Sequence, residues 1–208
     1  ASSIHLAEYL CEQGWDRIHI AFPFNIREIP RLNRLASKQR LSLQLVNAAS
    51  AKALVEGLTA QVDFFIELDA GYGRTGVQLS DSNSLEAILE QAERTDNLQF
   101  RGFYIHPGHT YYGKDTAKIH QESKDALAQM KAKYRNRYPN LITRLGDTPG
   151  CAVMEDFGEV DELGPGNFVF FDLMQVQLGS CQKKDIAVCL AVPVVDIQAG
   201  RKEILIHG

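Results

Sequence analysis

The sequence predicts an α/β protein, a TIM-type (β/α)8 barrel followed by the start of a β domain. Short apolar runs with the composition of strands alternate with helical runs along most of the 208 residues, and this alternation requires crossover connections and a parallel sheet. Polar residues follow many of the predicted strands, which favours a barrel because a barrel assembles its site from many strand ends. A doubly wound sheet, the alternative, would concentrate its site at one switch point.

The first predicted element is a helix over Ser3–Gly14, because apolar residues recur there with helical spacing and glycine commonly follows a last helical turn. A strand follows over Ile18–Phe22 and ends at Pro23. Helical spacing returns over Ile26–Ser37, where Pro30 lies in the first turn, a position that tolerates proline.

The next elements continue the alternation. A strand is predicted over Leu41–Val46 and a helix over Ser50–Gly57, with Ser50 as its N-cap. Val62–Asp69 has the strongest strand pattern of the chain, and a glycine-rich turn closes it. The amphipathic run Ser82–Arg94 predicts another helix.

The pattern then repeats with a strand over Gln99–Ile105, a long polar helix over Thr116–Tyr138 and a strand over Leu141–Leu145. The aromatic and β-branched run Phe168–Phe171 predicts one more strand.

The end of the chain has a different pattern, because no helical run separates its β-rich segments. Residues 186–195 and 203–207 predict two strands of a hairpin joined across 198–201. We therefore expect a barrel over residues 1–183 and the first strands of a β domain over residues 184–208.

Composition excludes several classes of function. The chain carries 22 Lys plus Arg against 26 Asp plus Glu, a formal net charge of −4, whereas duplex-binding domains normally carry a basic surplus. The charged fraction of 23% and hydrophobic fraction of 45% are those of a globular protein. The sequence contains no run of 18 apolar residues, so it predicts no membrane span. Four cysteines without CxxC spacing indicate reduced thiols, and the lack of a leader pattern predicts the cytoplasm.

The first motif that could carry chemistry is Glu67–Val77, ELDAGYGRTGV. Alternation along the strand places Glu67 and Asp69 on one face, and three glycines then let the backbone turn tightly before Arg74. An arginine held by a short loop suits binding of a carboxylate, phosphate or phenolate. A salt-bridged turn explains the same residues, and local chemistry leaves both interpretations open.

The second motif is Gly102–Tyr112, GFYIHPGHTYY. Its two histidines, His106 and His109, are three residues apart and could bind a metal, but no cysteine or carboxylate follows at ligand spacing. We favour an imidazole that stacks on, or donates a hydrogen bond to, a planar ligand.

Two further motifs are rich in glycine. In Gly146–Gly150, GDTPG, the hydroxyl of Thr148 and the neighbouring amides suit phosphate binding, although an ordinary β-turn explains this segment better when it is taken alone. In Glu162–Asp172, ELGPGNFVFFD, Gly-Pro-Gly exposes amides to a ligand, and an ordinary loop would look the same.

Taken together and in this order, the four motifs resemble the pyridoxal-phosphate domain of fold-type III enzymes. The resemblance covers Ile18–Asp172 and is strongest to the D-threonine aldolase and D-serine dehydratase group, with alanine racemase more distant. It implies a barrel that holds pyridoxal 5′-phosphate at the carboxyl ends of its strands. It also implies that Arg74 faces the cofactor's phenolate or lysine region, that His106 stacks against its pyridine ring, and that Tyr111 lies beside its phosphate or the substrate.

The resemblance further implies that Thr148 binds the phosphate together with the amides of Gly166 and Asn167. One position departs from the family pattern, because Gly164 stands where the family usually has a basic residue. This departure puts the usual partner of the pyridine nitrogen in doubt.

Chemistry with this cofactor needs a Schiff-base lysine, and no lysine of the chain ends a predicted barrel strand. The resemblance implies that this lysine lies upstream of Ala1, and that the ligands of a divalent metal, His with Asp or Cys, lie downstream of Gly208. We therefore expect a barrel that lacks its first strands, contains no catalytic lysine and no metal ligand, and is inactive alone.

The implied parent is an enzyme of D-amino acids, a homodimer that acts as an aldolase- or dehydratase-type lyase or as a racemase. The sequence leaves the substrate and the reaction open. One alternative, which Gly164 favours, is a non-catalytic barrel that binds pyridoxal phosphate or another phosphate ligand. A second is a barrel lyase without pyridoxal, for which only Glu67 and Asp69 offer paired carboxylates.

Overall fold

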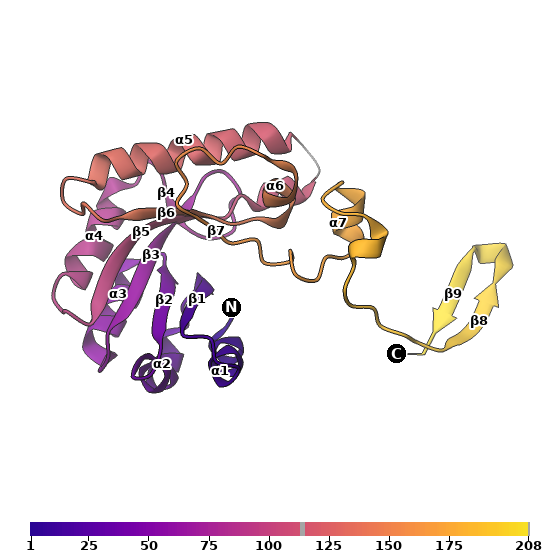
Figure 1. The fold of residues 1–208 in the computed structure, drawn as a ribbon, viewed down its shortest axis with the longest axis horizontal. Coiled ribbons are helices and arrows are strands. Elements are labelled where there is room, and N and C mark those ends of the chain that lie inside the picture. Colours follow the sequence, from indigo (N-terminus) through magenta and orange to yellow (C-terminus); the bar gives the residue numbers. More distant parts are fainter. Residues whose placement is uncertain (113–114, 208) are drawn as a thin grey trace.

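The computed structural model describes residues 1–112 and 115–207, and its main body is a curled parallel sheet with helices on its outer side (Figure 1). The order in the sheet is β1-β2-β3-β5-β6-β7, with β4 paired to β3 off this path, and every pairing is parallel. The strands are β1 (Arg17–Pro23), β2 (Arg40–Leu45), β3 (Val62–Asp69), β4 (Val77–Gln78), β5 (Leu98–Ile105), β6 (Ile142–Leu145) and β7 (Glu162–Leu163). The sheet is a half-barrel, in agreement with the predicted TIM-type fold.

Helices connect the strands as crossovers, which a parallel sheet requires. The helices are α1 (Ile4–Glu12), α2 (Ile29–Ala36), α3 (Ala48–Gly57), α4 (Ser82–Ala92), α5 (Thr116–Tyr134), α6 (Thr148–Val153) and α7 (Leu173–Gln177). Short 3-10 turns lie at η1 (Ile26–Glu28), η2 (Gly108–Tyr112), η3 (Lys183–Asp185) and η4 (Ala199–Arg201). Within the described residues, none of these helices has the length and apolarity to cross a bilayer.

The core lies between the outer face of the sheet and the helices. Leu43, Phe64, Ile66 and Phe103 point outward and are fully buried against this layer. Each such side chain stabilises the fold by about 1.5–3 kcal/mol relative to exposure. Because side chains alternate along a strand, the residues between them face the inside of the curl, and many of these are polar.

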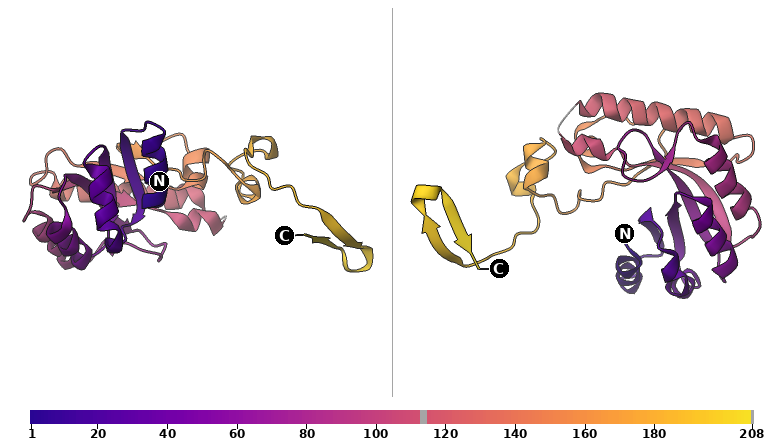
Figure 2. Two further views of the ribbon diagram at one scale, coloured as in Figure 1. Left: turned by 90° about the horizontal axis from the view of Figure 1, so that it is seen from below. Right: turned by 180° about the vertical axis from the view of Figure 1, so that it is seen from behind.

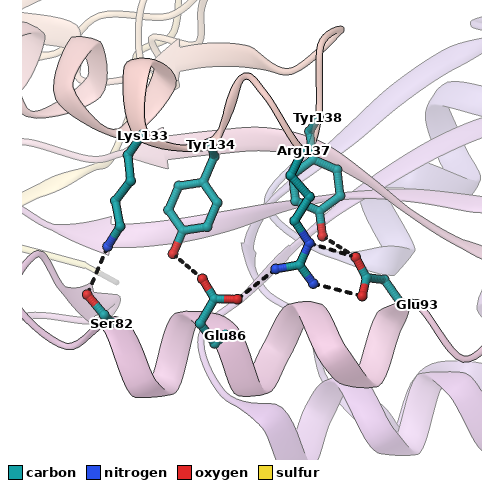
Figure 3. A network of polar contacts seen from close by, with 7 residues as sticks. All are labelled: Ser82, Glu86, Glu93, Lys133, Tyr134, Arg137 and Tyr138. Atoms are coloured by element: carbon teal, nitrogen blue, oxygen red, sulfur yellow. Dashed lines mark hydrogen bonds and ion pairs between the residues drawn. The ribbon is translucent and has the colours of Figure 1, made fainter.

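Polar contacts also join α4 and its C-cap to the end of α5 and the turn that follows it (Figure 3). The Arg137 guanidinium donates to both carboxylate oxygens of Glu93, at 3.0 and 2.7 Å, and to Glu86 at 2.7 Å. The hydroxyls of Tyr134 and Tyr138 donate to Glu86 at 2.8 Å and to Glu93 at 2.6 Å. These bonds hold two helices of the outer layer side by side.

Helix boundaries differ from the sequence prediction at several places, and α1, α2 and α4 are each shorter than predicted. Helix α3 begins at Ala48, and its N-cap is Asn47, whose side chain accepts from the Ser50 amide at 2.8 Å. The prediction of Ser50 as the cap was therefore wrong, because the helix begins two residues earlier. Helix α5 ends at Tyr134, so its predicted extension to Tyr138 was also wrong.

The predicted strand over Phe168–Phe171 is a turn. Phe171 has a φ of 50°, and the Phe171 amide donates to the Asn167 carbonyl at 2.8 Å. Phe168, Val169 and Phe170 are all exposed. The β-rich composition misled the prediction, since no described strand lies alongside to complete a ladder.

The last segment is a two-stranded antiparallel hairpin of β8 (Val194–Gln198) and β9 (Glu203–Ile206). The predicted hairpin exists, but its first strand begins at Val194 rather than at Ile186. The pair stands apart from the curled sheet (Figures 1 and 2), and its apolar side chains, such as Ile197 and Ile204, are exposed. The division into domains over residues 1–183 and 184–208 stays a prediction.

Candidate functional site

The polar loops that follow β3, β5, β6 and β7 meet at the carboxyl ends of the strands. Nδ1 of His106, directly after β5, bonds the Gly146 carbonyl oxygen after β6. The Asn167 amide, in the loop after β7, donates to Thr148 Oγ1 at 2.9 Å. These contacts bring residues far apart in the sequence into one region, as expected where parallel strands end at a common edge.

The loop after β3 is organised by Asp69. Its Oδ1 accepts from the amides of Gly71 and Gly73, each at 3.0 Å, and its Oδ2 accepts from the Gln78 side chain at 2.8 Å. Burial opposes ionisation of Asp69, but these hydrogen bonds outweigh it and hold its pKa below the ordinary value. Asp69 therefore shapes the loop and has little capacity left to act on a ligand.

Glu67 faces the inside of the sheet and pairs with Arg74. Its Oε1 lies 3.7 Å from the Arg74 guanidinium and accepts from Thr75 Oγ1 at 2.6 Å. Burial raises the pKa of Glu67, and these two contacts oppose the rise. The Arg74 side chain is 35% exposed and lies over the rings of Phe22 and Tyr72, at 5.4 and 5.7 Å from their centroids. The motif thus forms the salt-bridged turn considered above, yet leaves part of the guanidinium accessible.

The residues 71–76 match GxGxxG, the glycine pattern of dinucleotide-binding folds. In those folds the glycines open directly into a helix whose N-terminus receives the pyrophosphate. Here β4 comes next, and helix α4 does not begin until Ser82. The glycines therefore serve the turn around Asp69 rather than a dinucleotide.

The loop after β5 forms an aromatic cluster around Tyr72. The His106 ring lies edge-on to Tyr72 with centroids 5.6 Å apart, and the His109 ring stacks on it at 6.1 Å. Tyr111, in η2, lies 6.5 Å from His106. Burial lowers the pKa of His106, which the bond to Gly146 only partly offsets, so its imidazole is neutral at pH 7. Among residues 1–112 and 115–207, no three His, Cys, Asp or Glu side chains are grouped to hold a metal.

The loop after β6 is the start of helix α6 rather than the ordinary β-turn that the GDTPG segment alone suggested. Asp147 is its N-cap and accepts from the Gly150 amide at 2.6 Å. Thr148, the first helical residue, is fully buried, and Pro149 follows it. This arrangement presents the Thr148 hydroxyl to the Asn167 amide of the next loop.

The loop after β7 contributes exposed backbone and close packing. A Cβ on Gly166 would meet nothing within 4 Å, so its backbone is open to a ligand. A Cβ on Gly164 would contact the Arg144 guanidinium, 3.4 Å from Nε. The position that departs from the family pattern therefore lies beside a cation that comes from β6.

The six predicted site residues fall into two groups. Arg74 and His106 contact Tyr72, and Tyr111 lies against His106, while Thr148 and Asn167 bond each other beside Gly166. The bond from His106 to Gly146 links the groups through the backbone leading to Thr148. In the part of the chain that the structure describes, no side chain of the first group bonds directly to a residue of the second.

The sequence predicted no role for two polar residues of this region. Asp147 and Thr110 are buried and share a hydrogen bond of 2.8 Å. A usable signal existed for Asp147, because aspartate followed within two residues by proline is a common helix start. For Thr110 no local signal exists, since its partner is 37 residues away.

A separate cavity of about 850 Å³ lies inside the curl toward the amino ends of the strands. Its lining includes Arg17, Arg40, Asp63 and Arg101. The loops of the four motifs lie at the other end, where the strands finish, and only Glu162 and Leu163, which begin the fourth motif on β7, also line the cavity. Barrel enzymes place their chemistry at the carboxyl ends, so the motif region is the better candidate despite the size of this cavity.

Known proteins resemble this chain in sequence and fold. Residues 16–173 match the family described as alanine racemase, N-terminal domain. D-serine dehydratase of Dictyostelium discoideum is 30% identical over 156 residues, covering 69% of this chain and 39% of that protein. D-threo-3-hydroxyaspartate dehydratase of Delftia sp. (strain HT23) is 25% identical over 185 residues, covering 86% and 48%.

The solved structure of the same Delftia dehydratase superposes with a TM-score of 0.82 at 23% identity, covering 96% of this chain and 54% of that one. This likeness concerns the fold. The chain spans less than half the length of the two relatives matched by sequence.

Proposed function

Since the chain belongs to the alanine racemase N-terminal domain family, we propose that it is the cofactor-binding part of a pyridoxal-phosphate-dependent enzyme of D-amino acids. The observation that carries the proposal is the meeting of the four motif loops at one end of the sheet, which gathers an arginine, an imidazole, a hydroxyl and the open backbone of Gly166. The names of the relatives, two dehydratases of D-amino acids, support the class of substrate.

The residues present fit such a cofactor. Side chains on Gly71, Gly73 or Gly166 would meet nothing within 4 Å, so a flat phosphorylated ring can approach the backbone closely there. The accessible guanidinium of Arg74 suits the phenolate, and the neutral ring of His106 suits stacking. The open backbone of Gly166 suits the phosphate. The buried Thr148 hydroxyl and the Asn167 amide, which bond each other in this structure, would exchange that bond for the phosphate, and Tyr111 suits the phosphate or the substrate.

The chain's own residues would hold and orient the group. When bound, pyridoxal phosphate supplies an electron sink for the substrate's α-carbon. Arg74 keeps a positive charge beside the ring, because guanidinium is not deprotonated in proteins. The contact with Glu67 fixes the direction of that guanidinium. His106 offers a ring on which burial disfavours the charge of an imidazolium, and the bond between Nδ1 and the Gly146 carbonyl fixes the direction of the ring.

The proposed reaction is an aldolase- or dehydratase-type elimination or cleavage of a D-amino acid, or a racemisation. A homodimer, a cytoplasmic location and a divalent metal, held by residues other than those described, are further parts of the proposal. The second candidate is a barrel that binds pyridoxal phosphate without catalysis. Glycine at position 164 supports it, although Arg144 beside this position weakens that support.

Cofactor binding tests the proposal directly. The complete protein that contains the chain should bind pyridoxal phosphate with a new absorption band near the visible edge. The purified chain, which has no Schiff-base lysine, should bind the cofactor without that band. Arg74→Met and Thr148→Val should each weaken binding, because they remove a cation and a buried hydroxyl. If neither protein binds the cofactor, the proposal is wrong. Incubating the complete protein with D-serine or D-threonine, with and without a chelator, separates an enzyme from a non-catalytic binder.

A further inference from the structure

The loops after β5 and β6 are joined by a buried bond between two side chains outside the six residues proposed to hold the cofactor. Thr110 Oγ1 donates to Asp147 Oδ2 at 2.8 Å and also lies 3.0 Å from the Pro107 carbonyl oxygen. Thr110 is 0% exposed and Asp147 1%. A hydrogen bond to a carboxylate removed from water is among the stronger ones, and its loss leaves the carboxylate poorly solvated.

Asp147 in turn shapes the backbone around Thr148. The same Oδ2 that accepts from Thr110 accepts from the Gly150 amide at 2.6 Å. A Cβ on Gly150 would lie 2.7 and 2.8 Å from the two carboxylate oxygens and 2.9 Å from Cδ2 of buried His120. The carboxylate is therefore packed against residues 148–150 on one side and tied to Thr110 on the other.

We propose that Thr110 is a positioning residue for the phosphate-binding end of the site. Its hydroxyl holds Asp147, and Asp147 holds the backbone that carries Thr148. Thr110 acts through Asp147 and not by touching the ligand, because its hydroxyl is buried between the Asp147 carboxylate and the Pro107 carbonyl oxygen. The inference rests on the proposed function, since it takes a phosphate ester as the ligand of Thr148.

The test compares pyridoxal phosphate with pyridoxal, which lacks only the phosphate. Equilibrium dialysis of the purified chain gives the affinity for each ligand and therefore the preference for the phosphate ester. Thr110→Val keeps the shape of the side chain and removes the donor. We expect it to weaken binding of pyridoxal phosphate about tenfold, which is about 1.4 kcal/mol, and to leave binding of pyridoxal unchanged. Thr110→Ser, which keeps the hydroxyl, should restore the preference.

Thr143 on β6 offers a matched control. It is 1% exposed, and its hydroxyl donates to Asp161 Oδ2 at 2.9 Å. Thr143→Val therefore also removes a bond from a buried threonine to a carboxylate, here a half-buried one that does not contact Thr148. We expect this variant to lose stability and to keep the preference for pyridoxal phosphate. A merely structural role for Thr110 would make both valine variants behave alike.

The outcomes separate the inference from the function on which it rests. If the unchanged chain binds neither ligand, the proposed function fails, and the inference fails with it. If it binds both ligands equally, or if Thr110→Val keeps the parent's preference, the proposed function stands and the positioning role is overturned. An equal loss of preference in Thr143→Val overturns the role as well. Loss in Thr110→Val with recovery in Thr110→Ser supports it.

Discussion

Gly76 ends the turn after β3, and it packs against the backbone of the last residues of that strand. Its φ is +116°, and a Cβ at this position would lie 2.7 Å from the Asp69 amide nitrogen and 2.8 Å from the Leu68 carbonyl carbon. Gly71, in the same turn, has a similar φ of +106°, but its Cβ would meet nothing within 4 Å. Replacing each by alanine therefore separates the cost of an unfavourable φ from the cost of a steric clash.

The two costs have different sizes. An L-residue forced to positive φ loses about 1–2 kcal/mol, and both variants pay this. Gly76→Ala also pushes a methyl group into backbone that cannot rotate away, and overpacking of this kind costs about 1–3 kcal/mol more. We expect Gly71→Ala to lose about 1–2 kcal/mol of unfolding free energy and Gly76→Ala about 2–5 kcal/mol.

Urea unfolding of the parent and both variants, followed by circular dichroism, measures these differences. The slope with denaturant should stay constant, because neither change alters the surface exposed on unfolding. If the two variants agree within about 0.5 kcal/mol, the range of an ordinary surface substitution, the expected clash at Gly76 is absent. The close approach to β3 would then not constrain the turn.

Three further predictions follow from single contacts. Arg137→Met should destabilise the chain by about 1 kcal/mol, because its half-exposed guanidinium bridges Glu86 and Glu93 (Figure 3), and thermal unfolding should show a smaller loss at high salt. Asp69→Asn should be less stable than the parent at pH 7. The folded state lowers the pKa of Asp69, so the ionised carboxylate stabilises the fold fully above the ordinary pKa of 3.8. This stabilisation is lost as the pH falls through the lower pKa of the folded state. The difference in unfolding free energy between the parent and the variant, measured against pH, should therefore disappear there. Arg74→Lys should weaken pyridoxal phosphate binding in a dialysis assay, because a point charge replaces a planar fork.

Much of the fold could be predicted because strand and helix patterns are local. Val62–Asp69 has the predicted bounds, since eight residues of consistent composition end at a glycine turn. The error at Phe168–Phe171 has the opposite cause, because a strand needs a neighbour and composition does not report one. Strand β7, Glu162–Leu163, is too short to leave a pattern, and only its register with Arg144 and Leu145 reveals it.

The candidate site shows the same limit. Motif order placed Arg74, His106 and Thr148 near strand ends, because each follows a recognisable strand. The sequence could not reveal that His106 bonds the Gly146 carbonyl, or that Asp147 bonds Thr110, since these contacts span 40 and 37 residues. Such pairings depend on the curl of the sheet, which sets how closely neighbouring loops approach.

The two faces of the curled sheet differ in composition and in their contribution to stability. Its outer face is apolar and packs on the helices, so truncating Leu43 or Phe64 would remove core volume at a cost of about 2–5 kcal/mol. Its inner face carries Gln44, Glu67 and Tyr104, all buried, where barrels usually stack branched aliphatic residues. Polar groups in that position add little to stability unless they are fully bonded. Glu67 Oε2 and Gln44 Oε1 have no partner among the described residues. The outer face therefore contributes most of the stability of the sheet, and the inner face contributes little to it.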